Sequence, residues 1–259
     1  MAKSINIYKS ISDYNDGYDE RKNISISLII DDEEEEIVDS HVKSGFVTFT
    51  AEENNSTIGL EKLSTNQTLE YKTDASDWTN MNISTTIALT NVGDKVYLRG
   101  VLSGDNTLTD YTQFKMTGKI AAIGECNALW NKDDLNAPLK ECCGVNMFRG
   151  CTGLTQAPEL PATTLANSCY NYMFYGCTGL IQAPVLPATK LKTYCYRYMF
   201  NGCSNLNYIK CLVTNTSSIT YNWVSGVAST GTFVKSSGVN WKTGARGIPS
   251  GWDVVDAEV

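Results

Sequence analysis

The chain has 259 residues, of which 42% are hydrophobic and 19% charged, a composition typical of a folded protein with one large or two modest cores. Its formal charge is −7 and its lysines and arginines are scattered, which argues against nucleic-acid binding because that function needs a dense basic surface. No apolar stretch approaches the roughly 18 residues of a membrane-spanning helix, so we expect no membrane insertion.

The first 44 residues differ from the rest and predict an attachment segment, domain 1–44. Isoleucine or leucine stands at every second position from Ile24 to Ile30, which is the period of a β-strand. We expect a solvated loop over the acidic block Asp31–Glu36, with a divalent-cation site as the alternative. The remainder is too polar to build its own core. Because the N-terminus lacks an apolar run of signal-peptide length, we expect the chain to stay in the compartment where it is made.

Residues 45–130 carry a β pattern and predict a sandwich-like domain. Short runs rich in β-branched and aromatic residues recur with polar turns between them. We expect strands over residues 46–50, 69–73, 86–89, 95–99, 114–117 and 119–122. Asn91–Asp94 predicts a hairpin turn between the third and fourth of these strands, and Gly118 predicts another between the last two.

Residues 131–259 contain a 26-residue repeat, which is the strongest signal in the sequence. Residues 151–176 and 177–202 are identical at 18 of 26 positions. The same step relates the pairs Met147-Phe148, Met173-Phe174 and Met199-Phe200. One such unit cannot cover its own apolar face, whereas stacked units share a core. The pattern degrades after Leu206, where Trp241 and Trp252 predict an irregular C-terminal cap.

Each repeat unit predicts a helix. Thr163 suits an N-cap and Gly176 a C-terminal stop. Between them, Leu165, Cys169 and Met173 form one apolar stripe at helical spacing. The cysteines at equivalent repeat positions are expected to stack as buried, reduced side chains, with disulfides or a metal site as the alternatives.

The motifs Met-Phe-x-Gly-Cys-Thr-Gly-Leu and Ala-Pro-x-Leu-Pro-Ala-Thr resemble BspA-type leucine-rich repeats, over roughly residues 135–252. Residues 91–100 and 114–120 also look like the β module that precedes such repeats in proteins of gut Bacteroidetes and their phages. The expected fold class is α+β, with an N-terminal β-sandwich-like domain followed by a short leucine-rich-repeat solenoid and an irregular C-terminal cap. The resemblance implies adhesion or recognition and brings no catalytic residues.

No constellation of residues predicts catalysis. The single histidine, His41, lies in an expected linker, which disfavours a His-based triad. The acids lie mainly in the 31–36 run and in turns, and no Gly-rich phosphate loop opens a helix. We therefore expect no enzyme activity, with no catalytic residues, metal or cofactor.

The variable positions of the repeats predict a binding site. They fall three and four residues apart on the expected helices and would share one solvent-facing stripe. Exposed Tyr, Arg and Asn are common in recognition sites, although unburied positions also drift without any function. The candidate binding residues are Arg149, Ser168, Asn171, Tyr175, Tyr194, Arg197 and Asn201.

The first functional hypothesis is a phage virion protein, a head or tail fibre or decoration protein, that assembles in the bacterial cytoplasm. Residues 1–44 would contact other virion proteins, and the solenoid would contact a host-surface protein or glycan. A fibre would also suggest a homo-oligomer. The expected lack of an export signal favours this setting. The alternatives are a secreted bacterial cell-surface adhesin and a glycan-active enzyme.

Overall fold

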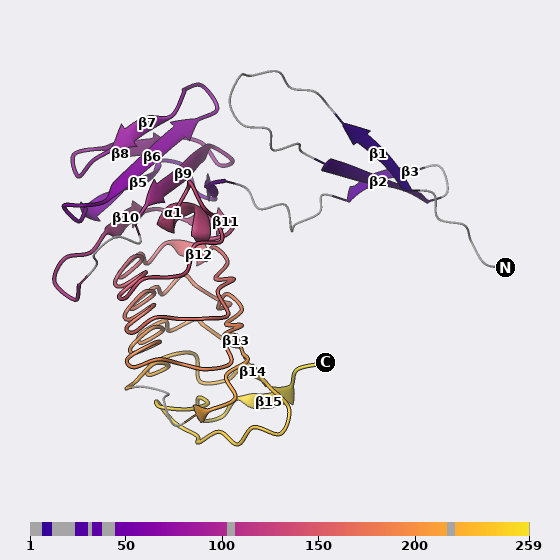
Figure 1. Ribbon diagram of the computed structural model, residues 1–259, viewed down its shortest axis with the longest axis vertical. Coiled ribbons are helices and arrows are strands. Elements are labelled where there is room, and N and C mark those ends of the chain that lie inside the picture. The colour runs from indigo at the N-terminus through magenta and orange to yellow at the C-terminus, as the bar shows by residue number, and fades with distance from the viewer. Residues whose placement is uncertain are drawn as a thin grey trace. The chain divides into compact units, whose positions relative to one another are not determined.

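The computed structural model describes residues 45–102, 107–216 and 221–258, together with the backbone of three N-terminal strands (Figure 1). Its contacts divide the chain into two compact units, residues 1–43 and 44–259. In the first unit, β1 (Ile7–Ile11), β2 (Ile24–Ile30) and β3 (Glu33–Ile37) form an antiparallel sheet in the order β1-β2-β3. The loop expected over the acidic block is therefore wrong for Glu33–Glu36, which pair with β2.

The second unit begins with two sheets. A six-stranded sheet has the order β12-β11-β4-β9-β6-β7, and a three-stranded sheet has the order β10-β5-β8. The strands of the larger sheet are β4 (Val47–Ala51), β6 (Thr68–Thr73), β7 (Thr79–Met81), β9 (Lys95–Val101), β11 (Ile120–Ile123) and β12 (Leu154–Gln156). Those of the smaller sheet are β5 (Ser56–Lys62), β8 (Thr86–Leu89) and β10 (Gln113–Thr117). All neighbours are antiparallel except β11 and β12.

Both expected hairpins are wrong. The turn over Asn91–Asp94 leads from β8 in the smaller sheet to β9 in the larger one, so the two strands do not pair. The turn at Gly118 likewise connects β10 to β11 across the two sheets. Both turns carry the chain from one sheet to the other over a shared core. In this core the ring centroids of Phe49 in β4 and Phe114 in β10 are 5.8 Å apart. Alternating burial along a strand identifies it but does not choose its partner.

The predicted α+β fold with a leucine-rich-repeat solenoid is wrong. The described residues contain a single helix, α1 (Asn127–Trp130), which is four residues long. The repeat segments that were expected to be helices consist of consecutive hydrogen-bonded turns instead. We call residues 141–151, 167–177, 193–203 and 221–226 the turn segments.

The turn segments use an alternating backbone. Ser168, Tyr170 and Tyr172 have φ angles of +59°, +63° and +56°, whereas no positive φ occurs at the residues between them. The amides of the intervening residues, such as Asn171, donate to the carbonyl three positions back. The amides of the residues with positive φ bond to neighbouring turn segments, which are stacked on one another. Tyr172 N–H donates to Arg197 O at 2.8 Å and Tyr170 N–H donates to Cys143 O at 2.9 Å. Hydrogen bonds to the segments on both sides offset left-handed conformations that cost on the order of 1–2 kcal/mol each.

The interior of the stack is aromatic. Phe114, Phe148, Phe174 and Phe200 follow one another at centroid distances of 5.2, 5.5 and 5.6 Å with nearly parallel rings. A second column contains Trp130, Tyr170, Tyr196 and Trp223. The Phe column begins in the β-sheets and continues through the turn segments, so the second unit has one continuous core.

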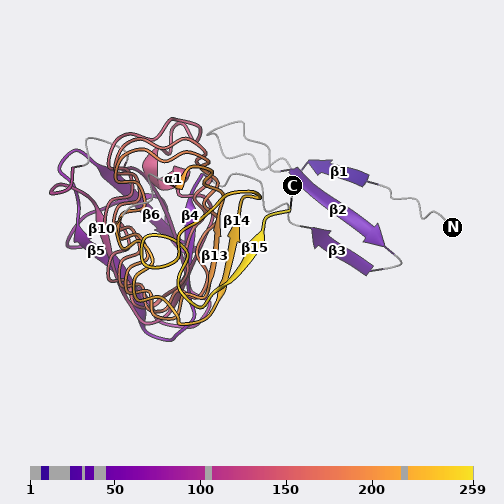
Figure 2. The same cartoon turned by 90° about the horizontal axis from the view of Figure 1, so that it is seen from below.

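The C-terminal part adds a small parallel sheet. Its strands β13 (Tyr208–Cys211), β14 (Thr232–Lys235) and β15 (Asp253–Asp256) lie side by side (Figure 2). Trp223 Nε1 donates to Gly247 O at 2.9 Å, and Trp252 Nε1 donates to Ala228 O at 2.7 Å. The first bond ties Gly247 to the fourth turn segment, and the second ties Trp252 to the residues that follow that segment.

Candidate functional site

Tyrosine and arginine side chains form a continuous array along one side of the turn segments. Every member contacts another member, and they come from successive turn segments and the residues after them. We call this set the Tyr–Arg surface: Arg149, Tyr172, Tyr175, Tyr194, Arg197, Tyr198, Tyr221 and Arg246.

Ring stacking and cation–π contacts hold the Tyr–Arg surface together. The Arg149 guanidinium lies 5.5 Å from the ring centroid of Tyr172 and 5.2 Å from that of Tyr175. Tyr172 stacks on Tyr198 of the next segment at 4.6 Å. Each such cation–π contact is worth about 0.5–1 kcal/mol at an exposed site. The contacts therefore restrain long side chains before any ligand arrives.

The second half of the Tyr–Arg surface centres on Arg197. Its guanidinium lies 5.5 Å from the Tyr194 ring, 5.4 Å from the Tyr198 ring and 6.0 Å from the Tyr221 ring. Arg246 covers the Tyr221 ring at 3.8 Å. Tyr194 and Tyr221 remain 47% and 49% exposed. The array therefore presents ring edges, phenolic hydroxyls and guanidinium donors to solvent, except for Arg197 Nε, which is buried and has no hydrogen-bond partner among the described residues.

The residues expected from the repeats divide between this surface and the interior. Ser168 and Asn171 are buried, with 7% and 1% of their surface exposed, so they are not part of the surface. Asn201 is half-buried and its side-chain amide donates to Asn222 O at 3.3 Å. The other four lie in the Tyr–Arg surface: Arg149, Tyr175, Tyr194 and Arg197.

Four members of the surface escaped the sequence analysis. On a helix, Tyr172 would lie beside the buried stripe, whereas the turn backbone leaves it half-buried and stacked on Tyr198. Tyr221 and Arg246 lie beyond the regular repeat. Tyr172 and Tyr198 are 26 residues apart, and this repeat spacing was the sequence signal that could have identified both of them.

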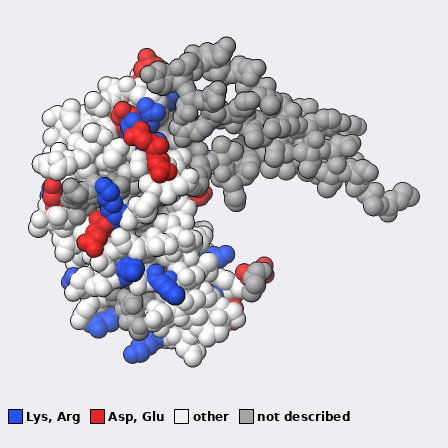
Figure 3. Space-filling model, in the orientation of Figure 1, with Lys and Arg blue, Asp and Glu red and all other residues white. Residues whose placement is uncertain are grey.

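Charge is segregated along the chain, which the sequence analysis also missed. Residues 160–252 contain seven lysines and arginines and no aspartate or glutamate, although the whole chain has a formal charge of −7. On the face seen in Figure 3, acidic atoms gather toward the β-sheets, whereas the part that holds the later residues shows mainly basic atoms. The described ion pairs include none of Arg149, Arg197 and Arg246.

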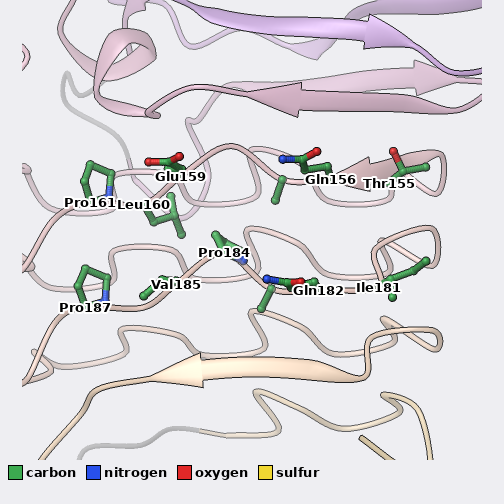
Figure 4. Close-up of a pocket in the computed structure, with 12 residues that line it drawn as sticks. Thr155, Gln156, Glu159, Leu160, Pro161, Ile181, Gln182, Pro184, Val185 and Pro187 are labelled. Carbon is green, nitrogen blue, oxygen red and sulfur yellow. The ribbon is translucent and has the colours of Figure 1, made fainter. Parts of the chain in front are cut away.

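A groove of about 720 Å³ is a second candidate site (Figure 4). It lies between residues 155–161 and 181–187, the two proline-containing stretches of the repeat. No backbone hydrogen bond joins these stretches in the described part of the chain, and their prolines have no amide to donate. Ile181 and Val185 are exposed at its edge, and Glu159 is its single carboxylate. The lining is mostly apolar and amide-bearing.

The cysteines are structural. All nine are free and eight are buried, which confirms the burial expected for the cysteines at equivalent repeat positions. Burial raises the pKa of Cys151, Cys203 and Cys211 to about 12, so these thiols do not ionise near neutral pH. Cys177 Sγ donates to Phe148 O of the preceding segment at 3.0 Å, and Cys203 Sγ donates to Phe174 O at the same distance. Each thiol thus adds a second hydrogen bond to a carbonyl that already accepts from a backbone amide.

Within the described ranges, no cluster of three or more His, Cys, Asp or Glu side chains is arranged to bind a metal ion. In the same ranges, no helix has the length and apolar character needed to cross a bilayer. His41 and the first two residues of the acidic block, Asp31 and Asp32, lie outside the described residues.

No protein-family model, curated protein or solved structure matches the chain. The resemblance to BspA-type repeats therefore stays a prediction from the repeated motifs, and the candidate sites rest on their own geometry.

Proposed function

We propose that this chain is a non-enzymatic recognition protein that binds carbohydrate on a cell surface through the Tyr–Arg surface. The observation that carries the proposal is the unbroken run of contacts from Arg149 to Arg246 across successive segments. Aromatic side chains with polar edges and arginines are the residues that recognition sites use most. An extended ligand with many hydroxyl groups could contact every segment in turn.

The chemistry of the two candidate sites supports binding without turnover. The Tyr–Arg surface has no carboxylate or imidazole to act as a base. The groove has one carboxylate in its lining, whereas glycoside hydrolysis commonly uses two. The buried thiols are held protonated and face the core, away from any substrate.

A glycan panel tests this function. We expect the purified full-length protein to bind a subset of oligosaccharides and to release no reducing ends. Tyr198→Ala should weaken binding about tenfold, since it removes the ring that joins Tyr172 to Arg197. Tyr97→Ala is the matched control, because Tyr97 lies in β9, outside the turn segments, and packs against Phe46 at 5.2 Å between ring centroids. Equal affinities for both variants, or no binding to any glycan, would overturn the proposal.

The setting on a phage particle, with residues 1–44 as the attachment to other virion proteins, is part of the same proposal. The N-terminal sheet β1-β2-β3 forms a compact unit of its own, which suits a separate attachment role. Mass spectrometry of purified virions tests it. We expect the protein in the particle at constant stoichiometry, and its absence from intact virions would refute the setting while leaving carbohydrate binding open.

A further inference from the structure

We infer that the ligand of the Tyr–Arg surface is an acidic saccharide chain, bearing carboxylate or sulfate groups at intervals along its length. This inference rests on the proposed function and adds the charge of the ligand to it. Its starting point is the segregation of charge, with seven cations and no acidic residue over residues 160–252. A protein with a net charge of −7 concentrates positive charge in this stretch, which holds every member of the candidate binding surface except Arg149.

Within the part of the chain that the structure describes, the arginines of the surface have no acidic partner. Arg149, Arg197 and Arg246 are each held against tyrosine rings, and no described ion pair involves them. A guanidinium stacked on a ring keeps its N–H donors in its own plane, directed away from the ring face. Such donors match the two oxygens of a carboxylate or sulfate in a bidentate pair. The stacking thus prepares the donors while leaving the anion to come from outside.

The spacing of the arginines suits a linear chain. Arg149 belongs to the first turn segment and Arg197 to the third, and Arg246 contacts Tyr221 of the fourth. Neighbouring segments are separated by 5.5–5.6 Å, measured between the stacked Phe148, Phe174 and Phe200 rings. The side chains of Arg149 and Arg197 therefore extend from backbones two segments apart, so a chain that carries charges at intervals along its length can pair with both.

The arrangement of the rings favours a saccharide over a single-stranded nucleic acid. Base stacking needs open ring faces. Here Tyr172 and Tyr198 cover each other at 4.6 Å, and the face of Tyr221 is covered by Arg246 at 3.8 Å. The ring edges, the phenolic hydroxyls and the guanidinium N–H donors remain available to a ligand. These groups pair with the hydroxyl and acidic groups of a saccharide.

The test compares length-matched ligands by calorimetry with the full-length protein. The probes are oligogalacturonate and a heparin oligosaccharide as acidic chains, neutral cello- and laminari-oligosaccharides, and an oligothymidylate. We expect acidic chains to bind at least tenfold more tightly than neutral ones, with affinity falling as salt rises. Three ionic contacts predict a slope of about −2 in log affinity against log salt. This salt dependence is measured on the unaltered protein.

Single substitutions test whether the Tyr–Arg surface is responsible for the preference for acidic chains. Arg197→Gln should reduce affinity for the acidic chains about tenfold and affinity for the neutral chains by a smaller factor, while Lys62→Gln, a control within residues 45–130, should reduce neither affinity. Preferential binding of neutral chains without salt dependence would overturn the acidic ligand and leave the proposed function standing. Tighter binding of the oligothymidylate would overturn it in favour of nucleic acid. No binding to any saccharide would overturn both.

Discussion

Cysteine serves as a packing residue in this protein. Its side chain is small enough for the tight interval between turn segments, and its thiol can donate to a carbonyl 29 residues earlier in the chain, as Cys177 does to Phe148. The two cysteine columns were correctly predicted from their 26-residue spacing. Their thiols lie away from solvent, and the pKa of Cys177 is raised because burial disfavours the thiolate.

Alkaline pH should destabilise the fold. The pKa of Cys203 is raised from 9.0 to about 12, so between those values the unfolded chain loses a proton that the folded chain retains. Stability from this thiol is complete below pH 9 and falls as pH rises toward 12, by about 1.4 kcal/mol per pH unit. Urea unfolding at pH 8, 9 and 10 measures the decline. Cys203→Ala should make it shallower, whereas Cys142→Ala, at a half-exposed thiol, should change it less; equal slopes in both variants would contradict this account.

The unusual backbone of the turn segments also makes a residue-level prediction. Cys142 has a φ of +57°, which glycine adopts without strain and alanine does not. Cys142→Gly should therefore be more stable than Cys142→Ala by about 1 kcal/mol. A helix would reverse the order by a similar amount, because glycine is the poorer helix former. Thermal unfolding of the two variants, compared at the same pH, distinguishes the two backbones.

At the scale of elements, hydrogen bonds between segments replace those that a helix would make within itself. The apolar spacing of Leu165, Cys169 and Met173 fits a helix, and all three are buried, yet Cys169 and Met173 lie in a run of turns and Leu165 precedes it. Burial at every fourth position is compatible with both backbones, so the pattern alone could not exclude the turns. Neighbouring repeats supply the acceptors that favour them, as Arg197 does for the amide of Tyr172.

The phenylalanine column should carry much of the stability of the stack. Phe174 is fully buried between Phe148 and Phe200, with both rings about 5.5 Å away. Phe174→Ala should lower the free energy of unfolding by about 3–5 kcal/mol, because it leaves a cavity between well-packed rings. Phe174→Leu should cost less, and Phe46→Ala, at a half-buried ring outside the stack, serves as the control. Chemical denaturation checks the order, and a loss at Phe46 equal to that at Phe174 would contradict it.

At the scale of the whole molecule, residues 44–259 behave as one unit. The β-sheets and the turn segments share hydrogen bonds, since Phe114 N–H donates to Met147 O at 2.8 Å and Ile120 N–H donates to Gly153 O at 2.9 Å. The β11–β12 pairing also crosses from one part to the other. The β-sheets thus cover the aromatic face that the first turn segment would otherwise expose.

Fragments should reflect this organisation. A fragment of residues 44–259 should unfold at the same temperature as the full chain, because it keeps every contact of the second unit. A fragment of residues 131–259 should fail to fold cooperatively, since it loses Phe114 and exposes the ring of Phe148. Near-ultraviolet circular dichroism and thermal melts compare the two. Cooperative unfolding of the shorter fragment would show that the two parts are independent.

The amino-acid sequence by itself determined where most strands of residues 45–130 lie, the 26-residue step and the burial of the cysteines. Alternation and exact repetition are local properties, and they identify buried faces directly. Tertiary structure decided which strands pair, because β8 and β9 alternate correctly but belong to different sheets. Tertiary structure also decided that the repeats form turns and that the ring of Tyr172 stacks on that of Tyr198. These outcomes depend on hydrogen bonds and ring contacts between residues about 26 positions apart, whose free energy exceeds the cost of a left-handed backbone.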